Sequence, residues 1–321
     1  MPQNIVEYLR EMSVNNLFGL KSFNNSWPTW HAEIQNLFSG QIPTQQEILN
    51  IGDHLREVFS VTGQAGRSQS SVSEGGACWE AIVCWYLNLC TVNRRTVVIK
   101  HKKELIPDPI ADAITVTYGN SNSNTESDLI AITFPDKLDY TIDKNSININ
   151  GAGSTNPIPT YKTARSKYNY KEIINALVER DFNEIEIHII QCKTNWNDNA
   201  QIPMLWDAVY QAGNFRNGIS VGINGKSIHY VKRFTYSFVT LPSNKLKKDG
   251  KDTFKTNSTS VLRVLNLSGG NYWGLPSKSG IASSVKELVN RHLNTGYNNS
   301  VINTISMAIP QLSSTFNYFK L

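Results

Sequence analysis

The chain has 321 residues, of which 40% are hydrophobic and 18% charged, and this length is sufficient to bury a large core. It contains no run of about 20 apolar residues, so we expect no membrane-spanning helix, and its acidic, amphipathic start does not resemble a signal peptide. The net charge of +5 permits a nucleic-acid partner but does not require one.

Four cysteines, Cys78, Cys84, Cys90 and Cys192, occur in the chain. Three of them lie six residues apart within one apolar segment, which is not the spacing of a zinc site. We therefore expect reduced, buried thiols in an intracellular protein.

The N-terminal part is predicted to be helical. Apolar residues recur there at spacings of three and four, which predicts helices over residues 4–12, 30–38 and 44–61. A small, polar loop over 63–76 separates them from ACWEAIVCWYLNLC, residues 77–90, which is apolar nearly all round and is therefore expected to form a buried helix.

The middle of the chain alternates strand-like and helical segments. We predict strands over 95–100, 113–118, 127–134, 185–193 and 219–223, and helices over 171–181 and 203–212. This order indicates an α/β protein whose mixed sheet is flanked by helices. The remainder, 224–321, mixes strand-like runs, including 227–242 and 260–267, with loops and a late helix over 282–293.

Two acids in apolar surroundings are candidate site residues. Glu80 is the only charged residue between Gly75 and Asn93, and a lone buried carboxylate needs a partner or a metal. It can also lie on a thin exposed stripe or pair with a distant arginine. Asp128 opens a predicted strand, where it either belongs to a site or faces water.

The strand IEIHIIQCK, residues 185–193, ends on Gln191 and Lys193, which share one face because side chains alternate along a strand. These two side chains either enter solvent at the strand end or form part of a charged site. The oxygens of Asp128, Gln191 and the Cys192 backbone carbonyl, with Glu80 as a second carboxylate, suit Mg²⁺. Lys193 would then lie beside a scissile phosphate and help to orient or deprotonate a water.

The set Glu80, Ser127-Asp128 and Gln191-X-Lys193 resembles the PD-(D/E)XK nuclease superfamily, especially its type II restriction endonucleases, over about residues 74–223. Two positions depart from the pattern: Ser127 replaces the usual proline, and the uncharged Gln191 replaces the usual acid. The interval between Asp128 and Gln191 is also long, so the polar insert must extend from the sheet edge. Alternative acids for the position of Asp128 are Asp136, Asp139 and Asp143.

The resemblance implies a restriction-endonuclease-like core and a division of the chain into three parts. These are an N-terminal helical region (1–70), a catalytic core (71–223) with an insert (135–170), and a C-terminal α+β region (224–321) that is packed on the core and reads DNA. Glu186 and His188, in the strand over 185–193, point to the face opposite Gln191. Glu186 is therefore a poor candidate for the site, and His188 is expected to be structural.

Phosphate and base contacts favour Lys, Arg, Asn and Gln, although runs of charge are usually only solvated surfaces. The candidate DNA-binding residues are Arg67, Arg94, Arg95, Lys162, Arg165, Lys167, Asn195, Asn197, Lys245, Lys247 and Lys248.

The resemblance implies a Mg²⁺-dependent, site-specific endonuclease of double-stranded DNA that works as a homodimer in the cytoplasm of a prokaryotic cell beside a cognate DNA methyltransferase. A modification-dependent or structure-dependent nuclease remains open, and so does a non-catalytic DNA-binding protein on the same scaffold. A third possibility is an unrelated enzyme or binding module whose Gln-X-Lys is accidental; it would be supported if the acid and amide positions did not cluster in space.

Overall fold

The computed structural model describes residues 3–63, 70–124, 127–151, 153–162, 167–194, 201–214, 218–241, 259–272, 282–293 and 301–321. Within these ranges no helix is both long enough and apolar enough to cross a bilayer. The predicted DNA contacts Arg67, Arg165, Asn195, Asn197, Lys245, Lys247 and Lys248 lie outside the described residues.

Four helices form the N-terminal part, as the periodicity predicts: α1 (Ile5–Phe18), α2 (Lys21–Asn36), α3 (Gln45–Gly63) and α4 (Ser70–Cys90). Asn4 caps α1 by accepting a hydrogen bond from the Glu7 amide. Thr44 and Glu47 form a reciprocal capping box at the start of α3. From Trp79 onward α4 is almost entirely buried, which confirms the predicted buried helix.

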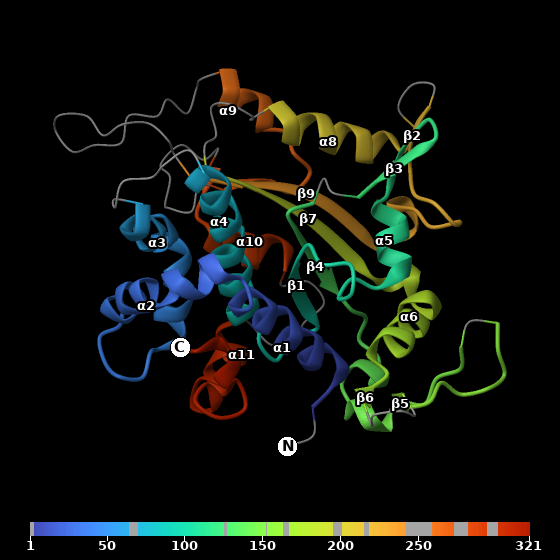
Figure 1. Ribbon diagram of the computed structural model, residues 1–321, viewed down its shortest axis with the longest axis horizontal. Helices are drawn as coiled ribbons and strands as arrows, with labels where there is room; N and C mark the ends of the chain where they lie inside the picture. Colours follow the sequence, from blue (N-terminus) through green and yellow to red (C-terminus); the bar gives the residue numbers. More distant parts are fainter. Residues whose placement is uncertain are drawn as a thin grey trace.

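A mixed sheet occupies the centre of the molecule (Figure 1). Its strand order is β1 (Thr96–Lys100), β4 (Leu129–Thr133), β7 (Glu186–Lys193), β9 (Arg233–Thr240), β10 (Gly270–Tyr272) and β11 (Ala282–Ser283). The first three strands pair antiparallel, whereas β7, β9, β10 and β11 pair parallel. The predicted α/β class, with a mixed sheet flanked by helices, is therefore confirmed.

Smaller elements surround this sheet. The further strands are β2 (Val116–Tyr118), β3 (Ser121–Ser123), β5 (Tyr161–Lys162), β6 (Lys167–Tyr168) and β8 (Ile219–Val221). The further helices are α5 (Asp108–Ile114), α6 (Tyr170–Arg180), α8 (Gln201–Ala212), α9 (Thr259–Val264), α10 (Val285–His292) and α11 (Val301–Ala308). The predicted strand over 260–267 is wrong, because its first half belongs to α9.

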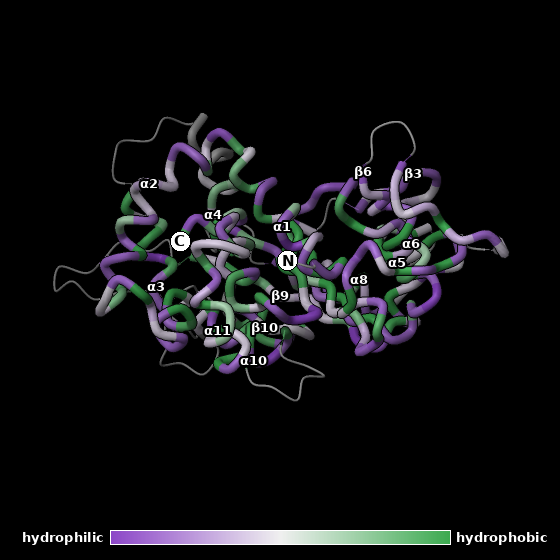
Figure 2. The backbone as a smooth tube through the Cα atoms, turned by 90° about the horizontal axis from the view of Figure 1, so that it is seen from below, coloured by the Kyte–Doolittle hydropathy of each residue, from purple (hydrophilic) through white to green (hydrophobic). Residues whose placement is uncertain are grey.

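Helices cover both faces of the sheet and create two cores. One core joins α2, α3, α4, α10 and α11 to side chains such as Ile190 and Cys192. The other joins α5, α6 and α8 to side chains such as Ile189 and Tyr236. Figure 2 shows these two groups of helices on opposite sides of the strands. Strand β9 lies inside the sheet although it belongs to the C-terminal region 224–321, and the division of the chain into three parts stays a prediction.

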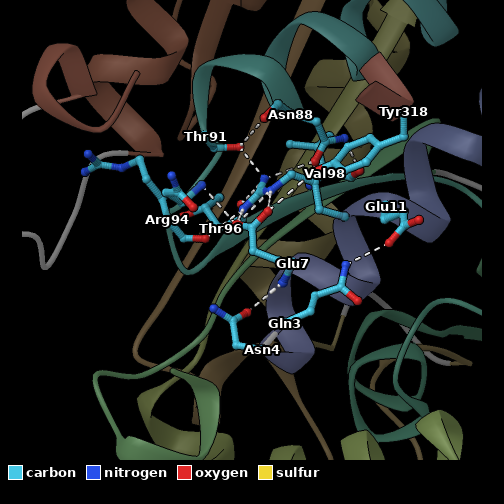
Figure 3. Close-up of polar contacts among 12 residues, drawn as sticks. Gln3, Asn4, Glu7, Glu11, Asn88, Thr91, Arg94, Thr96, Val98 and Tyr318 are labelled. Atoms are coloured by element: carbon cyan, nitrogen blue, oxygen red, sulfur yellow. Dashed lines mark hydrogen bonds and ion pairs between the residues drawn. The ribbon is translucent and has the colours of Figure 1, made fainter. Parts of the chain in front are cut away.

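Polar side chains of α1 and α4 cover the outer edge of β1, which would otherwise expose unpaired backbone groups (Figure 3). Asn88 donates to the Val98 carbonyl at 2.6 Å and accepts from the Val98 amide at 3.1 Å. The fully buried Arg10 donates to the Thr96 carbonyl at 2.8 Å. Helix α4 is thereby fixed against β1, which sets the position of Glu80 relative to the end of that strand.

Candidate active site

Three neighbouring strands meet at one end of the sheet: β1 and β7 end there, and β4 begins there. The register aligns Lys100 with Leu129 and Leu129 with Ile190. Asp128 precedes β4 by one residue and continues the ladder, since its carbonyl accepts from the His101 amide at 3.0 Å. The predicted acid at a strand start therefore lies between the ends of two other strands.

Asp128 and Lys193 are close to each other, as the sequence predicts. The Asp128 Oδ2 accepts a hydrogen bond from the Cys192 amide at 2.7 Å and lies 3.6 Å from the Lys193 Nζ. Their side chains are 16% and 30% exposed, so the pair lies at the surface of the sheet end, where a substrate can reach it. The carboxylate is thus held by the backbone of the strand that carries the lysine.

Glu80 joins this group from α4 and forms an ion pair with Lys100, the last residue of β1. Burial raises the pKa of Glu80 most strongly; the charge of Lys100 opposes this rise, Asp128 adds to it, and Lys193 lowers it. Two carboxylates and two ammonium groups therefore form one charged cluster. The partner of Glu80 is therefore a lysine and not the distant arginine that the sequence also allowed.

Gln191 follows Ile190, the partner of Leu129, so it lies beside Asp128 in the sheet, but its side chain is engaged by β9. Its amide oxygen accepts a hydrogen bond from the Tyr236 hydroxyl, and the residue is only 5% exposed. Gln191 and Lys193 share a strand face by alternation, whereas Glu80 and Lys100 approach from the opposite core. The structure consequently brings together Asp128, Lys193 and Glu80, and it places the Gln191 oxygen against a tyrosine.

Cys192 contributes its backbone and not its thiol. The thiol is buried in the core beside α4, and burial raises its pKa well above the usual range. Its amide is directed at Asp128, and in a ladder the N–H and C=O of one residue point toward the same neighbouring strand. The Cys192 carbonyl is therefore directed toward the Asp128 side, as a backbone ligand would require.

A Mg²⁺ ion fits this donor set in the way that it usually binds proteins, through one or two carboxylates plus waters and substrate phosphates. Asp128 and Glu80 would supply the carboxylates, and the Cys192 carbonyl would supply a further oxygen. Among the described residues no three His, Cys, Asp or Glu side chains converge on one point, so the protein alone forms no closed metal cage there.

Sequence reasoning missed two neighbours of the cluster, Lys100 and His101. Lys100 pairs with Glu80, and the imidazole Nδ1 of His101 lies 3.1 Å from the Ser127 hydroxyl. Burial lowers the pKa of His101; the charge of Lys100 lowers it further, and Asp128 opposes both. The signal was Lys100 at the end of the strand RTVVIK with His101 directly after it, but their role depends on β1 lying beside β4.

The candidate DNA contacts within the described residues differ in their exposure and in their ion pairs. Arg94 is 2% exposed, and its guanidinium donates to the Thr304 hydroxyl at 3.3 Å, which argues against the predicted DNA contact. Arg95 forms a 2.7 Å ion pair with Asp136 at the opposite end of β1 from the charged cluster. Lys162 and Lys167 are exposed on the β5–β6 hairpin.

The acids considered as alternatives to Asp128 all have other partners. Asp136 is engaged by Arg95, Asp139 pairs with Arg180 at 2.8 Å, and Asp143 caps a short 3₁₀ turn. Glu186 is buried and its carboxylate lies 3.3 Å from the Lys232 ammonium. Asp128 is therefore the best placed of these acids to share a site with Lys193.

A comparison with protein-family models finds no match to this chain, and a comparison with curated proteins finds no similar sequence. The resemblance to PD-(D/E)XK nucleases accordingly stays a prediction that rests on the residues above.

Proposed function

We propose that the protein is a Mg²⁺-dependent endonuclease that hydrolyses double-stranded DNA at a short specific sequence, in the manner of type II restriction endonucleases. The observation that carries the proposal is the proximity of Asp128 to Lys193, in one charged cluster with Glu80. A carboxylate pair and an ammonium at the accessible end of a sheet suit the binding of a phosphodiester beside a metal.

Each side chain has a role in this proposal. Asp128 and Glu80, with the Cys192 carbonyl, would hold the metal, which when bound supplies Lewis acidity and a more acidic water. The Lys193 ammonium lies close enough to Asp128 to reach the same phosphate, where it offsets the charge that develops and orients the attacking water. Gln191 would join the ligands only after releasing the Tyr236 hydroxyl.

The proposal extends to the assembly that the resemblance implies. A homodimer would match the twofold symmetry of a palindromic site. A methyltransferase of the same specificity would protect the DNA of the host cell.

A second candidate is a non-catalytic DNA-binding protein on the same scaffold. Two contacts favour it: Glu80 is already neutralised by Lys100, and the Gln191 oxygen is already taken by Tyr236. The retention of Asp128 beside Lys193 favours the nuclease, because a site without a catalytic role gains little from a partly buried charge pair.

Incubation of the purified protein with several unmodified phage DNAs, in Mg²⁺ and in EDTA, separates the two candidates. The nuclease predicts discrete fragments that require Mg²⁺ and whose mapped ends give the recognition sequence. Intact DNA in both buffers, together with binding in a gel-shift assay, would favour the non-catalytic candidate. Cleavage of only methylated or branched DNA would favour a modification-dependent or structure-dependent nuclease.

A further inference from the structure

A groove of about 730 Å³ lies outside the charged cluster, between α1, the loop that follows β1, and the β5–β6 hairpin with the start of α6. Its lining includes Tyr8 and five lysines, Lys102, Lys103, Lys162, Lys167 and Lys171. These lysines come from two regions of the chain about 60 residues apart, 102–103 and 162–171, that the fold brings to the same groove. The groove is therefore a strongly basic surface feature that only the folded chain creates.

The positive charge of the groove is mostly not neutralised within the protein. Lys171 forms a 2.7 Å ion pair with Asp108, but in the described part of the chain no ion pair involves the other four lysines. Glu104 is the one remaining acid among the lining residues. Four exposed ammonium groups thus face a single carboxylate.

The hairpin adds a second indication of an external anion. Lys162 and Lys167 lie directly opposite each other in the β5–β6 pair. Like charges directly opposite in a two-stranded pair are destabilising. An anion bound in the groove would relieve this repulsion.

The opposite wall is firmly supported and follows directly from the charged cluster. Lys102 comes two residues after Lys100 and donates to the Asn16 side chain at 2.5 Å. The loop behind it is held by the Tyr170 hydroxyl, which donates to the Leu105 carbonyl at 2.9 Å. The Lys171 ammonium donates to the Ile106 carbonyl at 2.6 Å. One wall of the groove is therefore connected to the end of β1, where Glu80 is paired.

We propose that this groove binds the sugar-phosphate backbone of double-stranded DNA and guides it toward the Asp128–Lys193 pair, an inference that rests on the proposed nuclease function. Phosphate contacts by lysine position a duplex without reading its sequence. Single-stranded DNA is a poorer fit, because base stacking needs free aromatic faces. Tyr168 and Tyr170 are only 7% exposed, and the Lys144 ammonium lies over the Tyr8 ring at 5.0 Å.

The test uses the full-length double variant Lys162→Gln/Lys167→Gln and a fluorescent 30-bp duplex of arbitrary sequence, with binding measured in EDTA over a series of salt concentrations. The slope of log affinity against log salt is expected to fall by about 2, since each lost phosphate contact removes about 0.9. Affinity near 0.1 M salt is expected to fall about tenfold or more by the same relation. The charge-retaining variant Lys162→Arg/Lys167→Arg should bind like the wild type.

The matched control is Lys21→Gln/Lys320→Gln, which removes two exposed positive charges outside the groove that form no ion pair within the described residues. Equal losses of affinity in the groove and control variants would overturn the proposal, and so would an unchanged salt slope in the groove variant. Tighter binding of single-stranded DNA or RNA than of the duplex would also overturn it. Because no cleavage is involved, the result is independent of whether the wild type cuts DNA, and the failure of either proposal can be recognised separately.

Discussion

Lys100 forms an ion pair with Glu80, the one charged residue between Gly75 and Asn93, and thereby joins the end of β1 to α4. Both side chains are nearly five-sixths buried, at 17% and 18% exposure. Lys100 is the counter-ion of Glu80. In the proposed nuclease this ion pair would have to break when a divalent cation binds Glu80. The ion pair and the metal therefore compete for one carboxylate.

This competition predicts that Lys100→Met binds Mn²⁺ about tenfold more tightly than the wild type, because a repulsive charge is removed and Glu80 is released. Isothermal titration calorimetry of Mn²⁺ into the protein at pH 8, without DNA, measures this affinity. Lys102→Met removes the same charge two residues further along the chain, where the side chain contacts Asn16, and should leave Mn²⁺ affinity nearly unchanged. Equal effects of the two variants would remove Lys100 from the account.

Gln191→Glu should strengthen metal binding, because a carboxylate adds the charge that the amide lacks and can still accept the hydrogen bond of Tyr236. We expect the Mg²⁺ concentration for half-maximal cleavage to fall about tenfold, and Mn²⁺ affinity measured without DNA to rise in parallel. Gln191→Leu leaves the buried Tyr236 hydroxyl without this acceptor and should lower stability by about 1–3 kcal/mol. If Gln191→Glu changes neither quantity, Gln191 is a structural residue.

Arg10 and Glu7 form the buried pair that helps to hold α1 against β1 and α4. The Arg10 guanidinium is fully buried, and the Arg10 Nε lies 3.0 Å from the Glu7 carboxylate. Arg10→Met should lower the free energy of unfolding by about 3–5 kcal/mol, because it leaves a buried carboxylate unpaired. The double variant Glu7→Gln/Arg10→Met should lose clearly less free energy of unfolding than Arg10→Met alone, because no buried charge is left unpaired. Urea unfolding measures both, and a double variant no more stable than the single one would contradict this explanation.

Because the pKa of the buried His292 is lowered, we expect the protein to lose stability in mild acid. Burial and, to a smaller extent, the charges of His188 and Arg233 lower its pKa from 6.5 to about 4. Its Nε2 bonds to the Gly269 carbonyl at 2.7 Å, and its Nδ1 faces the Arg233 guanidinium at 2.9 Å, so the neutral ring fits this site. Between pH 6.5 and 4 the unfolded chain binds a proton that the folded chain does not, and the free energy of unfolding falls by about 3 kcal/mol over that window.

Urea unfolding at pH 7 and pH 4.5 checks this prediction. His292→Phe should show a smaller difference between the two pH values than the wild type. Val289→Ala, on the same helix, removes no titratable group and should lower stability equally at both. A wild type and a His292→Phe variant with the same pH dependence would exclude His292 as the source.

The sequence predicted those parts of the site that depend on local pattern. The strand that ends on Lys193 and the acid that precedes β4 were recognisable because each lies at the end of an apolar run, and antiparallel pairing of β4 with β7 then brings Asp128 to Lys193. The buried helix around Glu80 was recognisable for the same reason. These features need only the period of the apolar residues and the adjacency of two strands.

The remaining features depend on contacts between distant segments. Lys100 becomes a partner of Glu80 only because β1 lies beside β4 on the side of α4, and Gln191 meets Tyr236 only because β9 pairs parallel with β7. Arg94 looked like a surface charge and is buried against α11. The segment 260–267 is apolar but short, and such runs do not distinguish a strand from a helix by period alone.

The most direct test of the central claim is cleavage of unmodified phage DNA by the wild type, Asp128→Asn and Lys193→Met, assayed side by side in Mg²⁺ and in EDTA. Asn keeps an oxygen for the Cys192 amide, so the first variant should fold normally. The account predicts discrete fragments from the wild type in Mg²⁺ alone. Neither variant should cut, while the affinity of Lys193→Met for DNA stays within about tenfold of the wild type, as the loss of one phosphate contact allows. Fragments of the same pattern from either variant would contradict the assignment of the Asp128–Lys193 pair as the catalytic centre.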